Sequence, residues 1–210
     1  MKNLILLLLM ITISSCAQDK SKAKEQPLQA SISQEGYKTA YFASGCFWCS
    51  ESIYESVMGV VKVVSGYSGG EGKNPTYKNY IRKGHAEAIA VTYDPKVIDF
   101  ESLLDVYFAS QNVTQQNGQG PDLGPGYRSI IFYQRAKEKA AIENKIAEIQ
   151  GNYTKPIAAE VKEFDKFWKA EDYHQNYKDK NPNNPYIRNV SLPRLNNFKD
   201  KLPEVLKENN

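Results

Sequence analysis

Two thiols three residues apart are the strongest chemical feature of this sequence. Cys46 and Cys49 lie in Gly45-Cys46-Phe47-Trp48-Cys49, which follows the apolar run 40–43 and opens a segment with helical spacing. A helix N-terminus stabilises an anion through its free N–H groups and its dipole, and this is a known way to lower a cysteine pKa. The pattern predicts a reactive Cys46 thiolate, with Cys49 on the same helical face and able to form a disulfide with an oxidised Cys46.

The cysteine pair alone is compatible with several kinds of site. It fits a thiol–disulfide oxidoreductase, half of a metal site, a structural disulfide or two small buried side chains. A zinc site is disfavoured because a second cysteine pair is missing and only His85 and His174 could complete the ligand set. We therefore expect no metal.

Hydrophobic periodicity predicts the elements that would hold the pair. Strands are expected over 39–43, 60–65, 87–93, 127–133 and 157–161, helices over 47–58, 100–108 and 135–149, and polar or Gly-rich loops over 66–77 and 111–126. Strands and helices alternate without the strict βαβ repeat of a parallel sheet. The predicted fold class is α+β, a two-layer sandwich.

The N-terminus is typical of an exported protein. Residues 1–15 contain Lys2 and an apolar run too short to span a bilayer, as in a signal peptide. Ile13-Ser14-Ser15-Cys16 resembles a bacterial lipobox, which predicts lipidation of Cys16; the alternative is a plain signal peptide with a chance cysteine. Residues 16–36 are predicted to form a polar tether and 37–210 the folded domain. The sequence thus predicts a lipid anchor in a bacterial cell envelope, on a membrane face toward the periplasm or the exterior.

Composition excludes some partners. The net charge is +3, with 24% charged residues, and no basic stripe with interleaved aromatic residues is present. We expect no nucleic acid partner, and we expect a monomer.

Short blocks rich in Gly, Tyr, His and acidic residues follow the cysteine pair. They are Gly66-Tyr67-x-Gly69-Gly70, Asn74-Pro75-Thr76-Tyr77, Gly84-His85-Ala86-Glu87-Ala88, Tyr93-Asp94-Pro95, Gln119-Gly120-x-Asp122-x-Gly124, Tyr127-Arg128-Ser129 and Glu171-Asp172-Tyr173-His174-Gln175. Together with Gly45-Cys46-Phe47-Trp48 and Glu51, they resemble peptide methionine sulfoxide reductase A from about residue 40 to 182. The resemblance implies a compact α/β fold with a ferredoxin-like core.

The resemblance also implies catalytic roles. Cys46 would be the nucleophile that attacks the sulfoxide sulfur, and Glu87 would be the acid that protonates the sulfoxide oxygen. Tyr77 and Tyr127 would bind that oxygen through their hydroxyls. Burial in an apolar pocket could raise the Glu87 pKa to suit this role.

Further residues of the motifs would bind the substrate. Phe47 and Trp48 would form the apolar wall that receives the S-methyl group, and Asp122 would help to organise substrate and water. His85 and His174 also lie in motif positions, and we interpret them as structural hydrogen-bonding residues.

The sequence departs from the family in two places. Relatives often use a resolving cysteine near the C-terminus, but this chain has no cysteine after Cys49, which stands where many relatives carry Gly. Our hypothesis is that Cys49 resolves the Cys46 sulfenic acid and that a thioredoxin-like donor reduces the resulting disulfide, with no bound cofactor. Gln111-Asn112 replaces a common His-Asp, which we interpret as a variation in loop packing.

Three functions follow as hypotheses. The leading one is reduction of the S-epimer of methionine sulfoxide, free or in oxidised proteins and peptides. The main rival is an envelope thiol–disulfide oxidoreductase that uses Cys46 and Cys49, and the third is a non-catalytic binding lipoprotein.

Overall fold

The computed structural model describes residues 36–208. The predicted signal peptide, the lipidation site Cys16 and all of the tether except Gly36 lie outside the described residues. Between residues 36 and 208, no helix combines the length and the apolar character needed to cross a membrane.

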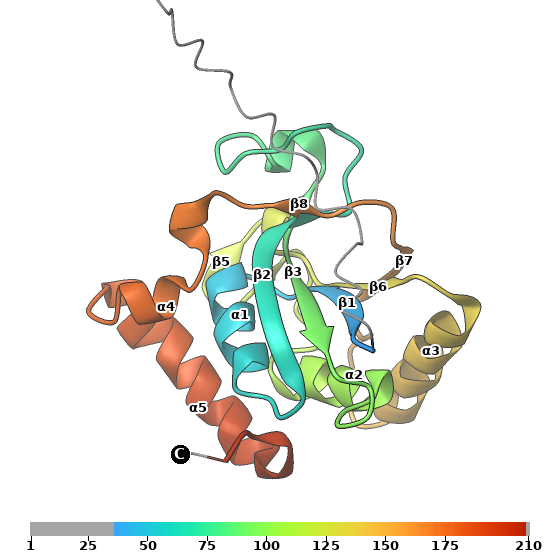
Figure 1. Cartoon of the computed structure of the whole chain (residues 1–210). Coiled ribbons are helices and arrows are strands. Elements are labelled where there is room, and N and C mark those ends of the chain that lie inside the picture. Colours follow the sequence, from blue (N-terminus) through green and yellow to red (C-terminus); the bar gives the residue numbers. More distant parts are fainter. Residues whose placement is uncertain (1–35, 209–210) are drawn as a thin grey trace, which may run out of the picture.

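A βαββαβ unit forms the centre of the fold (Figure 1). Its elements are β1 (Lys38–Ala43), α1 (Phe47–Glu55), β2 (Val60–Ser68), β3 (Ala86–Tyr93), α2 (Phe100–Ala109) and β6 (Ile130–Tyr133). The strands lie in the order β6-β1-β3-β2, and each neighbouring pair is antiparallel. This is the ferredoxin-like arrangement, so the predicted fold class is confirmed.

Later segments extend this unit at both edges. Strand β7 (Glu160–Glu163) pairs parallel with β6, β8 (Trp168–Lys169) pairs antiparallel with β2, and β4 (Gly118–Gln119) and β5 (Asp122–Leu123) form a separate hairpin. The remaining α-helices are α3 (Ala136–Gln150), α4 (Tyr177–Lys180) and α5 (Leu192–Lys201). Helix α5 packs along α1 and covers the outer side of the cysteine-bearing helix (Figure 1).

The central strands are buried on both faces of the sheet. Successive side chains of a strand point to opposite faces, so Ala40 and Phe42 of β1 enter one apolar cluster while Tyr41 and Ala43 enter another. The first cluster contains the inner sides of α1 and α2, and the second is covered by Phe164 and Phe167. Burial on both faces explains why the apolar run before Cys46 is continuous.

Several predicted boundaries are wrong. Strand β2 continues to Ser68 although 66–77 is predicted as a loop, because Gly66 and Tyr67 pair with both β3 and β8. A Cβ on Gly66 would lie 2.3 Å from the Phe167 ring and from the Trp168 carbonyl oxygen, so glycine is the residue that permits this pairing. The strand predicted at 157–161 lies at 160–163, the one predicted at 127–133 begins only at residue 130, and the helix predicted at 47–58 ends at residue 55.

The turn that delivers Cys46 to the start of α1 depends on Gly45. Its φ is +74°, in the left-handed region, and a Cβ there would lie 2.5 Å from Cβ of Gln119. Both constraints exclude larger residues. The position of Cys46 is therefore fixed by the chain entering the helix as well as by the helix itself.

We expect Gly45→Ala to lower the free energy of unfolding by about 1–3 kcal/mol, because the substitution forces alanine into a left-handed conformation against Gln119. Chemical denaturation measures this change. Gly151→Ala is the matched control, since Gly151 has φ −60° and a Cβ added there would meet no atom within 4 Å. Equal effects of the two substitutions would contradict the role assigned to this turn.

Candidate active site

Cys46 and Cys49 lie at the first turn of α1. Cys46 is the residue that caps the helix, with φ −56° and ψ 125°, and its carbonyl oxygen accepts hydrogen bonds from the N–H groups of Cys49 and Ser50. Both cysteines are thiols, and their residues are only 6% and 1% exposed. The pair is thus fixed within a rigid helical turn and largely shielded from water.

A buried carboxyl group lies against the same helix terminus. Glu87 of β3 is 2% exposed, and its two oxygens accept hydrogen bonds from the Phe47 N–H at 2.9 Å and from the Tyr80 hydroxyl at 3.2 Å. Burial raises the Glu87 pKa to about 8, despite the opposing effect of these two hydrogen bonds. Glu87 is therefore mainly protonated at neutral pH and can act as an acid.

Tyrosine hydroxyls line the approach to Glu87. Burial raises the pKa of Tyr77 and of Tyr127, and the nearby Glu87 raises both further. Both hydroxyls thus keep their protons and can donate hydrogen bonds. The carboxylate of Glu171 positions Tyr77, because it accepts from the Tyr77 N–H at 3.0 Å and from the Tyr67 hydroxyl at 2.8 Å.

Aromatic side chains form the wall beside Cys46. Trp48 stacks on Tyr177 with 3.7 Å between ring centroids and an interplanar angle of 6°, and its Nε1–H donates to Nδ1 of His174 at 3.2 Å. Phe47 is 1% exposed and lies 4.9 Å from the His174 ring, between centroids. His174 therefore fixes the orientation of both aromatic residues from the C-terminal part of the chain.

The expected low pKa of the Cys46 thiol is wrong for the free enzyme. Burial raises the Cys46 pKa well above its usual range, and the neighbouring Cys49 and Glu87 raise it further. Interaction with the Cys46 thiol instead lowers the pKa of Cys49 to about 6. The two thiols titrate as a pair, which loses its first proton readily and its second with difficulty.

Tyr186 is a site residue that sequence reasoning missed. Its hydroxyl lies 3.7 Å from Sγ of Cys49 and donates to Asp122 at 2.6 Å. Asp122, predicted to bind substrate, is therefore connected to the cysteine pair through this tyrosine. No local pattern marks Tyr186, because it stands 137 residues after Cys49, in a helical turn that follows a segment rich in Asn and Pro.

The structure thus places the predicted site residues around the start of α1. Hydrogen bonds, ring contacts or electrostatic interactions connect them, namely Cys46, Cys49, Phe47, Trp48, Tyr77, Glu87, Asp122 and Tyr127. The sequence predicts no site role for Tyr80, Glu171 or Tyr186.

The remaining motif residues have structural hydrogen bonds. His85 accepts at Nδ1 from the Gly70 N–H at 3.1 Å, and its Nε2 lies 2.6 Å from the Gly72 carbonyl oxygen. Gln111 and Asn112 bind the side chain of Gln119 in a neutral amide network. Uncharged side chains therefore pack this loop.

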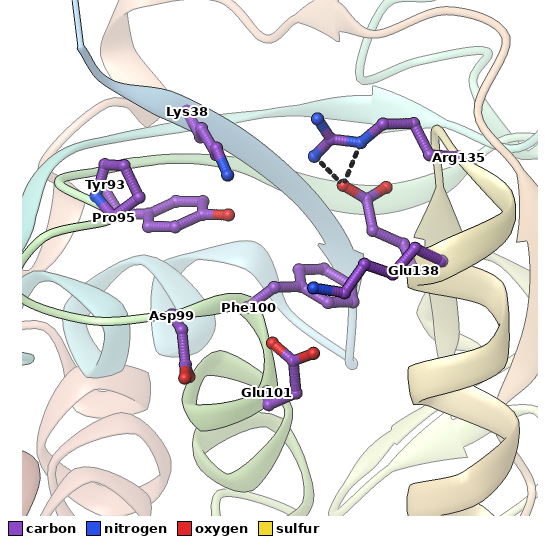
Figure 2. A pocket seen from close by; sticks show the side chains of 9 residues that line it. Lys38, Tyr93, Pro95, Asp99, Phe100, Glu101, Arg135 and Glu138 are labelled. Atoms are coloured by element: carbon purple, nitrogen blue, oxygen red, sulfur yellow. Dashed lines mark hydrogen bonds and ion pairs between the residues drawn. The ribbon is translucent and has the colours of Figure 1, made fainter.

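A cavity of about 270 Å³ lies apart from the cysteines, between the starts of β1, α2 and α3 (Figure 2). Its lining includes Lys38, Tyr93, Asp99 and the ion pair of Arg135 with Glu138, and none of the residues that line it is a cysteine or a histidine. Across residues 36–208, no three His, Cys, Asp or Glu side chains are grouped closely enough to hold a metal ion.

The paired titration can be measured by the ultraviolet absorbance of thiolate in a Cys16→Ser background. We expect one thiolate to form with a pKa near 6 and the second only at strongly alkaline pH. In Cys46→Ser, the Cys49 pKa should rise, because its main stabilising interaction is lost. A Cys46→Ser protein that still forms a thiolate at pH 6 would contradict the pairing.

The sequence of this chain is similar to that of a known protein family. Residues 38–206 match the family model described as peptide methionine sulfoxide reductase. Peptide methionine sulfoxide reductase MsrA of Pasteurella multocida (strain Pm70) is 43% identical over 170 residues, which cover 80% of this chain and 98% of the relative.

Solved structures show the same similarity. Mxr1 from Saccharomyces cerevisiae in reduced form has a TM-score of 0.67 and 34% identity, covering 70% of this chain and 87% of that one. Mxr1 in complex with Trx2 has a TM-score of 0.50 and 25% identity, covering 68% and 85%. With the family model matching most of the chain, this protein belongs to the peptide methionine sulfoxide reductase family.

Proposed function

We propose that the chain reduces the S-epimer of methionine sulfoxide, free or in oxidised peptides and proteins, with Cys46 as nucleophile and Glu87 as acid. Membership of the family makes the chain a methionine sulfoxide reductase; the epimer and the roles of the residues are the proposal. The observation that carries it is the buried Glu87 carboxyl group, which is held at the helix terminus beside Cys46 and whose pKa burial raises to about 8.

The first step needs an acid because a sulfoxide is a weak electrophile until its oxygen is protonated. The S-methyl group lies against Phe47 and Trp48, and Tyr77 and Tyr127 donate hydrogen bonds to the oxygen. Glu87 protonates the oxygen while the Cys46 sulfur attacks the sulfoxide sulfur. Methionine leaves, and Cys46 carries the oxygen as a sulfenic acid.

The second step returns the enzyme to its thiol form. Cys49 attacks the sulfur of the Cys46 sulfenic acid, a disulfide forms, and water leaves. A thioredoxin-type dithiol then reduces this disulfide and becomes oxidised itself. Two observations support this route: Cys49 is held in the same helical turn as Cys46, and a relative of this chain has been solved in complex with Trx2.

The rival function is thiol–disulfide exchange on protein disulfides. The same cysteine pair could perform it, but such exchange needs no proton for a leaving oxygen. The burial of a protonated carboxyl group against the helix terminus therefore favours sulfoxide reduction.

Glu87→Gln should lower kcat/KM for the S-epimer by about 10²–10⁴-fold, because glutamine keeps the shape of the side chain but has no acidic proton to transfer. In the wild type, kcat/KM should fall above pH 8, since the active form of Glu87 is protonated and its pKa is about 8. A coupled assay on the two separated epimers measures both effects, with Cys46→Ser as the inactive reference.

Glu51→Gln is the matched control, because Glu51 is also buried on α1 and has a pKa raised to about 7 by burial. We expect Glu51→Gln to retain the fall of kcat/KM above pH 8 that the wild type shows. If Glu87→Gln kept wild-type sulfoxide reduction, the acid role of Glu87 would be overturned. If the protein reduced disulfides but not sulfoxides, the rival function would replace this proposal.

We further propose that the enzyme is a lipoprotein of the bacterial cell envelope, processed before Cys16 and carried on the tether 16–36, with the reductase domain over 37–210. The support is the lipobox-like sequence at residues 13–16. Labelling of cells with a radioactive fatty acid should mark the wild-type protein but not Cys16→Ser, which should appear in the soluble fraction. Equal labelling of both proteins would contradict lipidation of Cys16.

A further inference from the structure

Arg194 of α5 is the charged residue fixed most closely to the turn before Cys46. Its Nη1 donates to the Ser44 carbonyl oxygen at 3.0 Å, and its Nε donates to the Ser110 carbonyl oxygen at 2.8 Å. A third contact joins Nη2 to the Ser44 hydroxyl at 3.4 Å. Because the guanidinium group is planar, bonds in these directions fix its orientation.

The positive charge of Arg194 is not neutralised by an ion pair among the residues the structure describes. All three of its hydrogen-bond acceptors are uncharged oxygens. A partly buried charge is screened less than one in open solvent. The charge therefore acts on the groups that share its groove, including the Asp122 carboxyl, whose pKa burial raises and this charge lowers.

The surroundings of Arg194 include the sulfur of the second cysteine. Arg194 and Cys49 both line a groove of about 660 Å³, whose lining does not include Cys46 or Glu87. Arg194 lowers the pKa of Cys49, although interaction with the Cys46 thiol has the larger effect. That larger effect ends when Cys46 becomes a sulfenic acid, but the charge of Arg194 stays.

We propose that Arg194 is a positioning residue for the resolving step, in which its fixed charge keeps Cys49 as a thiolate while Cys49 attacks the oxidised Cys46. This inference rests on the proposed function. The Cys49 sulfur forms the S–S bond, the S–O bond of the sulfenic acid breaks, and the hydroxyl group leaves as water after taking up one proton from solvent. In the reduction step that follows, the same charge stabilises the Cys49 thiolate when a donor thiolate attacks the Cys46 sulfur and Cys49 is the leaving group.

The test follows disulfide formation after one equivalent of methionine sulfoxide, by rapid quench and mass spectrometry across a range of pH. In Arg194→Gln, the rise of the rate with pH should move about one unit toward alkaline pH, so that the step is about tenfold slower below the midpoint. The rate at high pH should equal or exceed that of the wild type, because a more basic thiolate is the stronger nucleophile.

Two further variants separate charge from structure. Arg194→Lys keeps the charge and should restore most of the wild-type pH profile. Arg188→Gln removes an exposed arginine from the turn before α5 and should leave the profile unchanged. Equal slowing of Arg194→Gln at every pH would show a merely structural role and overturn the inference, as would a profile identical to that of Arg188→Gln.

A separate measurement distinguishes this inference from the proposed function. Titration of the reduced protein should show a higher Cys49 pKa in Arg194→Gln than in Arg188→Gln, whether or not sulfoxide turns over. An unchanged Cys49 pKa overturns the inference alone. A wild type that turns over sulfoxide without forming a Cys46–Cys49 disulfide overturns the resolving step of the proposed function, and with it the inference.

Discussion

The hydrogen bond from the Phe47 N–H to Glu87 is the interaction on which the rest of the site depends. It joins the first turn of α1 to the start of β3, 40 residues later in the chain, at 2.9 Å. The N–H group is free to bind because it belongs to the start of a helix, where no intrahelical acceptor exists. One bond therefore holds the acid beside the nucleophile and satisfies a buried backbone donor.

The same burial controls the protonation of both the acid and the nucleophile. It raises the pKa of Glu87, which keeps an acid available at neutral pH, and it raises the pKa of Cys46, which makes a free thiolate costly. The second thiol lowers the cost of forming a thiolate in this buried site, because the two sulfurs share a single negative charge. In the proposed mechanism, Cys49 thus contributes to the reactivity of the resting enzyme as well as to its regeneration.

Much of the fold could be predicted from the sequence, because β1, β3 and α2 carry strong periodic or continuous apolar patterns. The cysteine pair could also be predicted, because its two thiols lie three residues apart in the sequence. Tyr186 and Arg194 could not, because each reaches the site through a loop or helix at the far end of the chain and neither lies in a local pattern. The predicted pKa of Cys46 is wrong because the helix terminus is visible in the sequence, whereas the burial that raises the pKa is produced by tertiary packing.

In the proposed mechanism, Cys46 and Cys49 form one reductive unit and Glu87 supplies its proton. Mass spectrometry of the wild type after a single turnover with excess methionine sulfoxide, without any donor, tests this unit most directly. We expect one methionine released per protein and a Cys46–Cys49 disulfide. A sulfenic acid that persists on Cys46 beside a free Cys49 thiol would contradict it.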